Sequence, residues 1–78
     1  MIRRQQIAAA RALVSWNKAH LSEIAGVSER TIARFESGEG DITASKLDKL
    51  EIALRDAGVE FIDGGVVADH LKIARRSG

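Results

Sequence analysis

Two short runs of helix-forming residues flank a single glycine near the middle of the chain, and this pattern constrains the fold more than any other. The first run ends at residues 21–25, and Gly26 follows it directly. Ser28 is a residue type that favours the position just before a helix, and the second run extends from there to Gly38. Glycine readily takes the left-handed conformation that often ends a helix. The spacing therefore predicts two helices joined by a tight turn, the second over about residues 28–37.

The same signals predict one helix before this pair and one after it. Residues 3–14 are rich in helix formers, and Asn17 is a suitable cap for the helix that ends near residue 25. Thr43 or Ser45 caps a fourth helix, which Gly58 closes. Apolar residues recur at helical spacing in these segments. Those expected to face the core are Ile7, Ala10, Val14, Leu21, Ile24, Ala25, Val27, Ile32, Phe35, Leu47, Leu50, Leu54 and Ala57.

The end of the chain supports two interpretations. Residues 59–62 and 65–68 are apolar runs on either side of Asp63-Gly64, which is typical of a β-hairpin. Residues 66–74 could equally form a fifth helix. We therefore expect an all-α fold of four to five helices, with residues 1–62 as the main domain. The tail, residues 63–78, adds a hairpin, a strand or a helix and is a candidate dimerisation element.

Composition excludes several classes of function. The chain has no cysteine, which excludes disulfides and thiolate metal sites, and no apolar run approaches the roughly 20 residues of a membrane span. His20 and His70 are the only histidines, and no metal-ligand cluster surrounds them. Residues 15–18 spell the Ser-x-x-Lys of some acyl-transfer enzymes, but the companion motifs are missing. We expect a cytoplasmic protein that is not an enzyme and binds no metal or cofactor.

Positive charge is concentrated in the first half of the chain. Residues 1–35 carry six basic and two acidic residues, a net charge of +4. Residues 36–78 carry six basic and nine acidic residues, a net charge of −3. This asymmetry favours one face that meets a polyanion and another that stays away from it.

The outward side of the helix over residues 28–37 carries part of that charge. At about 100° per residue, Arg30 and Arg34 point away from the side that Ile32 and Phe35 define. Arginine suits paired contacts with guanine edges and contacts with phosphates. Two short helices with a tight turn are also the geometry that presents the second helix to a major groove. The sequence therefore predicts a DNA-binding protein, with residues 1–62 as the helix-turn-helix DNA-binding domain.

The stretch from Arg11 to about Phe61 resembles the lambdoid-repressor (XRE, Cro/C1-type) helix-turn-helix family. The agreement covers residues 11–18, 21–28, 31–38 and 47–61. The resemblance implies about five helices, with the third as the recognition helix and the N-terminus of the second against the phosphate backbone. It also implies a structural pair between Arg11 and Glu36.

The resemblance further implies roles for individual residues. The base contacts it implies are Glu29, Arg30 and Arg34, while Ser28 and Thr31 would contact either bases or phosphates. Glu29 could instead simply stabilise the positive N-terminus of its own helix. The phosphate contacts it implies are Arg11, Asn17, Lys18 and Ser37. Lys18 departs from the family by replacing the usual glutamine. Ser15 replaces a turn glycine, at a cost of about 1 kcal/mol if that position is left-handed. Residues 68–78 do not follow the family's usual closing strand.

The function expected from these features is sequence-specific binding of double-stranded DNA by a transcriptional regulator. A homodimeric repressor of a short inverted-repeat operator is the first interpretation, because one helix reads only a few base pairs. The alternative is a DNA-binding antitoxin that also binds and neutralises a partner protein. Fold alone does not separate the two, and only residues 59–78 would be available for such a partner.

Overall fold

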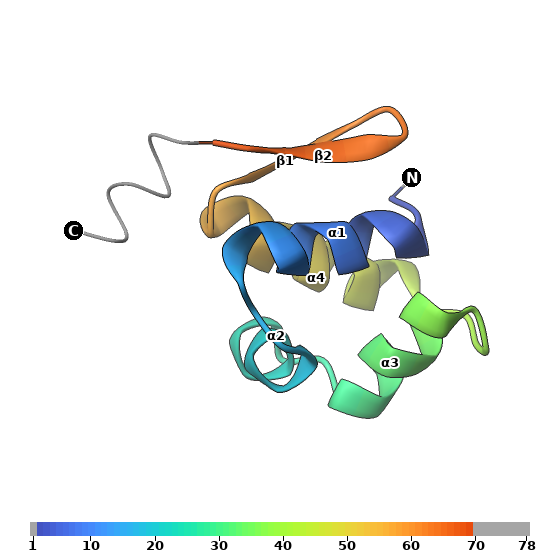
Figure 1. Ribbon diagram of the computed structural model, residues 1–78. Coiled ribbons are helices and arrows are strands. Elements are labelled where there is room, and N and C mark those ends of the chain that lie inside the picture. Colours follow the sequence, from blue (N-terminus) through green and yellow to red (C-terminus); the bar gives the residue numbers. More distant parts are fainter. Residues whose placement is uncertain (1, 70–78) are drawn as a thin grey trace.

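The computed structural model describes residues 2–69 and arranges them as four helices followed by a two-stranded antiparallel hairpin (Figure 1). The elements in chain order are α1 (Arg4–Val14), α2 (Lys18–Ala25), α3 (Glu29–Ser37), α4 (Ala44–Asp56), β1 (Val59–Ile62) and β2 (Gly65–Ala68). This architecture confirms the prediction of a mainly helical fold with a C-terminal hairpin. Within the described residues, no helix is long and apolar enough to span a membrane.

Side-chain caps fix where three of the helices begin. Asn17 accepts a hydrogen bond from the backbone N–H of His20, and Ser28 accepts one from the N–H of Thr31. Thr43, rather than Ser45, accepts from a backbone N–H in the first turn of α4. Each cap satisfies one of the backbone donors that a helix start leaves without a partner.

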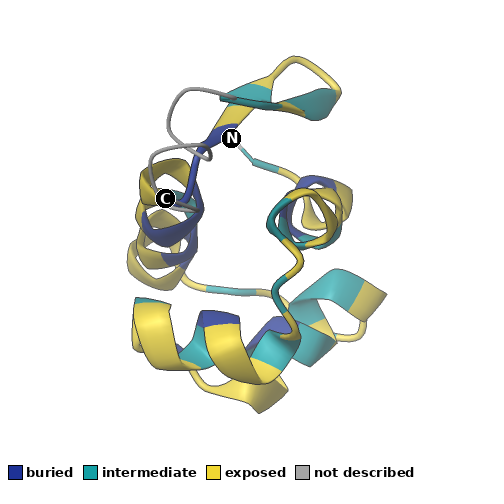
Figure 2. Ribbon diagram, turned by 60° about the vertical axis from the view of Figure 1, so that its left-hand side comes forward, coloured by how far each residue is buried: buried dark blue, intermediate teal, exposed yellow. Residues whose placement is uncertain are grey.

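The core lies between the four helices, and Figure 2 shows its buried residues on the inward sides of the elements. Five large side chains, at least one from each helix, are fully buried: Ile7, Leu21, Ile32, Leu50 and Leu54. Of the apolar residues expected in this core, Ile24 is the clear exception. Its side chain is 52% exposed, so the expectation that it faces inward is wrong.

The exposure of Ile24 follows from which side of α2 is packed. Leu21 is buried, and Ser22 and Ala25 are half-buried, so the packed side centres between these residues. At about 100° per residue, Ile24 lies roughly 100° away from that centre. Small residues, rather than a second large one, therefore occupy the inward side of this eight-residue helix.

The hairpin packs against the helices through one of its faces. Its register pairs Val59 with Ala68 and Ile62 with Gly65. The inward residue Val59 is buried against the helical core, whereas Ile62 and Val67 face outward. Because residues 65–68 form β2, the alternative of a helix beginning at residue 66 is wrong over residues 66–68. The remainder of that alternative, residues 70–74, lies outside the described residues.

A buried glutamine joins the hairpin to the first helix. The side-chain nitrogen of Gln6 donates to the carbonyl oxygens of Ile62 and Gly65, at 2.8 and 2.9 Å. Its side-chain oxygen accepts from the backbone N–H of Arg3 at 2.8 Å. Gln6 is a buried polar residue, and it ties the N-terminus and the hairpin turn to the same point.

The division of the chain into residues 1–62 and 63–78 stays a prediction. Residues 63–68 belong to the hairpin that packs on the helices, and residues 70–78 lie outside the described part.

Candidate nucleic-acid interface

The turn between α2 and α3 is short because Gly26 ends one helix and Ser28 begins the next. Gly26 has φ 72°, and its N–H donates to the carbonyl oxygen of Ser22. Val27 lies between the two caps and is buried, which anchors the turn to the core. The two helices therefore stand in the compact arrangement that the glycine spacing predicts.

One side of α3 is packed and the opposite side is open. Ile32 is fully buried and Phe35 packs against the core while partly exposed. Arg30 and Arg34 are exposed on the outer side. Glu29 is exposed too, at the first position of the helix. The helix thus presents two guanidinium groups to solvent, about one turn apart.

The two hydroxyls at the start of α3 bond to each other. The Oγ of Ser28 donates to the Oγ1 of Thr31 at 2.8 Å and accepts from the Thr31 N–H at 3.1 Å. The hydroxyl hydrogen of Thr31 is left to donate outward, next to the exposed Arg30. Their roles as base contacts stay predictions.

The far end of α3 carries Arg34 and Ser37. The guanidinium of Arg34 lies against Gly40, with its Nε 3.3 Å from where a Cβ at Gly40 would stand. The hydroxyl of Ser37 donates to the backbone oxygen of Arg34 at 3.1 Å. Ser37 is exposed, but its hydroxyl hydrogen is already used in this bond. A phosphate accepts hydrogen bonds, so a contact with one requires the hydroxyl to turn away from the helix and donate to the phosphate instead.

Arg4 joins this end of α3, which the sequence did not predict. Its guanidinium carbon lies 3.2 Å from where a Cβ at Gly38 would stand, although Arg4 is at the start of α1. Gly38 has φ 80° and caps α3, so a guanidinium stands beside the negative end of the helix dipole. In the sequence, the basic residues at the start of the chain contribute only to the charge asymmetry, because no local pattern links them to residue 38.

The N-terminus of α2 holds the predicted phosphate contacts Asn17 and Lys18. The Oδ1 of Asn17 caps the helix at 2.7 Å from the His20 nitrogen. Its Nδ2 makes no hydrogen bond within residues 2–69 and is available as a donor. Lys18 begins the helix and is half-buried, so its stem packs while its ammonium can reach outward. A helix N-terminus favours a nearby anion through its free N–H groups.

Arg11 and Glu36 form the pair that the family resemblance implied. Two parallel hydrogen bonds join them, and a third runs from Nη1 of Arg11 to the carbonyl oxygen of Trp16. The pKa of Arg11 is raised by its hydrogen bond to Glu36, while burial of the guanidinium opposes that rise. Three of the five guanidinium N–H groups are engaged, and two are left for a phosphate.

Over residues 2–69, no group of three or more potential metal ligands comes together. The candidate site is defined by the basic residues of α3 and of the start of α2: Arg30 and Arg34 are exposed, and Lys18 is half-buried. Together with Arg4 at the start of α1, their arrangement suits an extended polyanion.

Comparison with known families agrees with this geometry. A family model described as a helix-turn-helix (HTH_3) matches residues 7–55, which is more than half of the chain. No curated protein matches the chain. The matched region contains most of α1, all of α2 and α3, and nearly all of α4, and that family comprises DNA-binding regulatory domains rather than enzymes. The chain belongs to the XRE-type helix-turn-helix family of DNA-binding regulators.

Proposed function

We propose that the protein is a repressor that binds a short inverted-repeat operator as a homodimer, with α3 of each copy in a major groove. The observation that carries this proposal is the exposure of Arg30 and Arg34 on the side of α3 opposite the buried Ile32. A helix packed in this way can enter a major groove about 12 Å wide while its inner side stays packed against the core.

The residues divide into readers of bases and anchors on the backbone. Arg30 and Arg34 are assigned to guanine edges, because a guanidinium can donate two parallel hydrogen bonds there. Glu29 is assigned to a cytosine amino group, while it also stabilises the positive start of its own helix. Ser28 and Thr31 complete the set, since their hydroxyls lie at the end of α3 that leads into the groove.

Anchoring on phosphates is assigned to a second set of donors. Asn17 and Lys18 supply an amide and an ammonium at the start of α2, beside its free backbone N–H groups. Arg11 supplies the guanidinium donors that Glu36 leaves free. Ser37 supplies a hydroxyl at the far end of α3. Such contacts fix the register of the protein on DNA but do not read sequence.

Two copies are needed because one recognition helix covers only a few base pairs. In a dimer, two such helices reach successive major grooves about 34 Å apart and read both halves of an inverted repeat. Repression then follows if the operator overlaps a promoter, since the bound dimer excludes polymerase.

Selection of bound sequences from a random DNA pool, at fixed and stated salt, tests the proposal. We expect a consensus with two-fold symmetry. The same consensus placed over a reporter promoter should lower expression when the protein is present. A pool that shows no enrichment would refute sequence-specific reading, and a rise in reporter expression would refute repression.

A further inference from the structure

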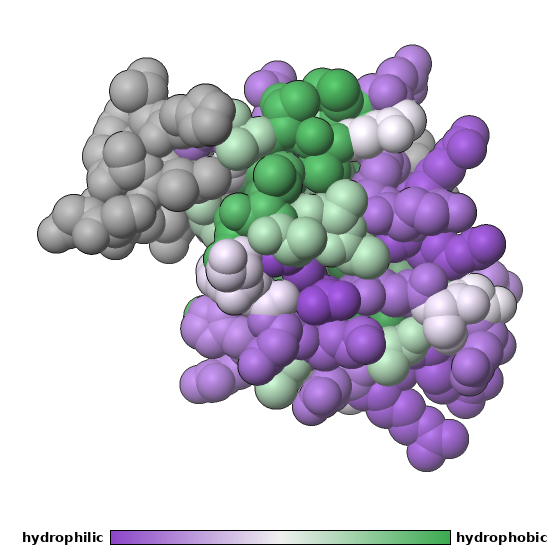
Figure 3. Space-filling model, viewed as in Figure 1, coloured by the Kyte–Doolittle hydropathy of each residue, from purple (hydrophilic) through white to green (hydrophobic). Residues whose placement is uncertain are grey.

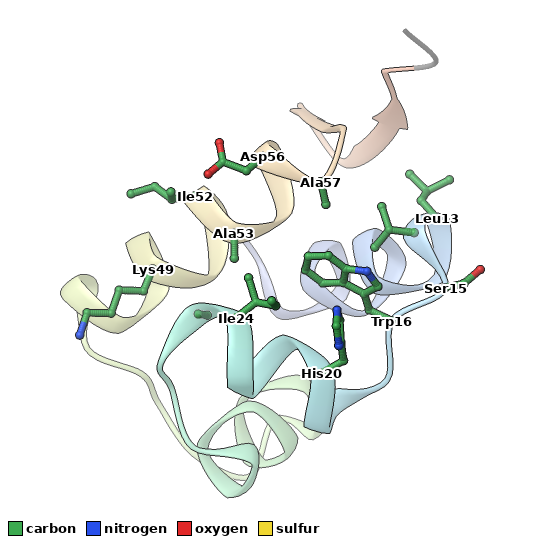
Figure 4. A pocket seen from close by; sticks show the side chains of 12 residues that line it. Leu13, Ser15, Trp16, His20, Ile24, Lys49, Ile52, Ala53, Asp56 and Ala57 are labelled. Atoms are coloured by element: carbon green, nitrogen blue, oxygen red, sulfur yellow. The ribbon is translucent and has the colours of Figure 1, made fainter. Parts of the chain in front are cut away.

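A broad groove lies on a side of the molecule that the DNA-binding residues do not use. It runs between the C-terminal end of α1, helix α2 and helix α4, and has a volume of about 740 Å³ (Figure 4). Trp16 lies in it with its ring edge against the ring of His20, the two centroids 4.7 Å apart. Ala53 of α4 and Ala57, the residue that caps this helix, point into it, and their small side chains leave it hollow (Figure 4).

Large hydrophobic side chains stand exposed around this groove. Among the described residues five such side chains are exposed, and three of them line it: Leu13 (41%), Ile24 (52%) and Ile52 (59%). Exposed apolar side chains gathered around one groove make it a candidate interaction site. The other two, Ile62 and Val67, lie on the hairpin, where Figure 3 shows a second hydrophobic area.

The outer side of α4 along the groove carries a positive, an apolar and a negative residue in that order. Lys49, Ile52 and Asp56 follow one another at spacings of three and four, which places them on one side of the helix (Figure 4). Within residues 2–69 neither Lys49 nor Asp56 makes an ion pair, whereas Arg55 on the same helix bonds to Glu51 at 2.6 Å.

This order of charges is complementary to itself in one arrangement. If a second α4 lies antiparallel to the first, Lys49 of each copy meets Asp56 of the partner subunit, and both Ile52 side chains lie near the two-fold axis. A parallel arrangement would instead bring like charges together. The antiparallel contact is symmetric about a two-fold axis, as the contact of a homodimer requires.

We infer that the groove and the side of α4 with Lys49, Ile52 and Asp56 form the homodimer interface. That a dimer forms is taken from the proposed function. The position of its interface is inferred from the charges and the exposed side chains. Ile52 of each copy covers the apolar groove of the other, beside Ile24 and Trp16, and two reciprocal ion pairs fix the direction.

The inferred contact leaves the DNA-binding side free. No residue of α3 lines the groove, so Arg30 and Arg34 are not part of the contact. The exposed Asn17 at the start of α2 does not line it either. Dimerisation and DNA binding therefore use different surfaces of the same small fold.

Charge exchange across the interface tests the inference, with the dimer dissociation constant measured by analytical ultracentrifugation of the full chain without DNA. Lys49→Glu alone and Asp56→Lys alone should each weaken the dimer at least about tenfold, because each replaces two attractions by two repulsions. The double variant restores both pairs and should return to within about threefold of the parent protein. Lys46→Glu, the same charge change at an exposed residue outside the groove, should leave the constant unchanged.

A second variant tests the apolar centre. Ile52→Asp should abolish the dimer at concentrations where the parent protein is fully dimeric, while circular dichroism shows the fold intact. Ile62→Asp, the same change at an exposed isoleucine of the hairpin, should leave the dimer unaffected. The inference is overturned if the double charge exchange fails to recover association, if Ile62→Asp disrupts the dimer and Ile52→Asp does not, or if the parent protein is monomeric at all concentrations.

These experiments distinguish a failure of the inferred interface from a failure of the proposed DNA-binding function. If the interface is elsewhere, the Ile52→Asp protein still dimerises, while sequence selection by α3 is untouched. If the proposed DNA reading is wrong, the charge-exchange series behaves as expected but no DNA sequence is preferred. A monomeric Ile52→Asp protein that keeps preference for a single half-site supports both.

Discussion

Arg11 on α1 and Glu36 on α3 face each other through two parallel hydrogen bonds, Nε to Oε2 at 2.7 Å and Nη2 to Oε1 at 2.6 Å. A third bond, from Nη1 to the carbonyl oxygen of Trp16 at 3.1 Å, ties the same guanidinium to the linker between α1 and α2. The two side chains are only 17% and 8% exposed. One guanidinium thus fixes α3 relative to the two helices before it, and so determines where the outward arginines stand.

Replacing Glu36 by Gln should destabilise the protein by about 1–3 kcal/mol, because a partly buried guanidinium loses its charged partner. Urea unfolding followed by circular dichroism measures the change. Arg11→Lys should lose a similar amount, since an ammonium cannot form the two parallel bonds. The matched control is Glu51→Gln in the i, i+4 pair with the exposed Arg55, which should change stability by less than about 0.5 kcal/mol. Equal losses in both pairs would contradict the structural role assigned to Arg11.

The raised pKa of Arg11 also predicts how this pair responds to pH. A group whose pKa is higher in the folded state contributes stability below its unfolded pKa and loses it as pH rises through the folded value. For an arginine that loss falls in strongly alkaline solution. The stability difference between the parent protein and Arg11→Lys should therefore stay constant between about pH 7 and 9. A difference that shrinks steadily over this range would show that another titrating group controls the pair.

Replacing Gln6 by Ala should loosen the hairpin and cost about 1–2 kcal/mol, since the carbonyl oxygens of Ile62 and Gly65 lose a buried donor. Hydrogen exchange at the hairpin amides should accelerate more than exchange in α3. Gln6→Glu separates the two roles of the side chain, because it can still accept from Arg3 but can no longer donate. Gln5→Ala, at the exposed neighbouring position, is the control and should be nearly neutral. If Gln5→Ala loosens the hairpin as much as Gln6→Ala does, the bonds of Gln6 are not what holds it.

The helices were predictable because their signals are local. Asn17 and Ser28 sit where the sequence predicts helix starts, and Gly26 and Gly38 have the positive φ values expected of helix ends. The sequence does not distinguish Thr43 from Ser45, because both residue types favour the cap position and they stand two residues apart. The choice between a hairpin and a fifth helix depends on tertiary contacts. The exposure of Ile24 also could not be read from spacing, because an eight-residue helix offers too few turns to define its packed side.

The candidate site likewise has residues that could be predicted from the sequence and residues that could not. Arg30 and Arg34 follow from helical geometry around Ile32, and the Arg11–Glu36 pair from family resemblance. The position of Arg4 beside Gly38, and the bonds of Gln6 to residues more than 50 positions away, join distant parts of the chain. Such contacts leave no periodicity, so only the folded arrangement shows them.

Replacing Ser15 by Gly should stabilise the protein by about 0.5–1 kcal/mol. Ser15 has φ 58° and ψ 37°, and it is the one non-glycine residue of the described chain with a positive φ. A Cβ in this left-handed conformation is strained, and glycine removes the strain. Thermal unfolding at fixed protein concentration should show a higher Tm. Ser15→Ala removes the hydroxyl but keeps the Cβ, so it should show no gain; a rise in both variants would mean that the hydroxyl, not the backbone, is responsible.

Substitutions on α3 and at the start of α2 should separate base reading from phosphate binding. Arg30→Ala or Arg34→Ala should weaken binding to the selected operator by about 1–3 kcal/mol and relax the preference at one base pair, because a bidentate contact to a base is lost.

Lys18→Ala should weaken binding to operator and scrambled DNA alike, and should reduce the slope of log K against log salt by about one unit per site, because one fewer counterion is released. Titrations at several salt concentrations on both DNAs measure the two effects, with Lys46→Ala on α4 as the unaffected control. Arg34, unlike Arg30, lies against Gly40, so relaxation of specificity should be greater for Arg30→Ala if this contact persists on DNA. Equal losses on both DNAs for all three variants would mean that α3 contacts only the backbone, and the assignment of its arginines to bases would be wrong.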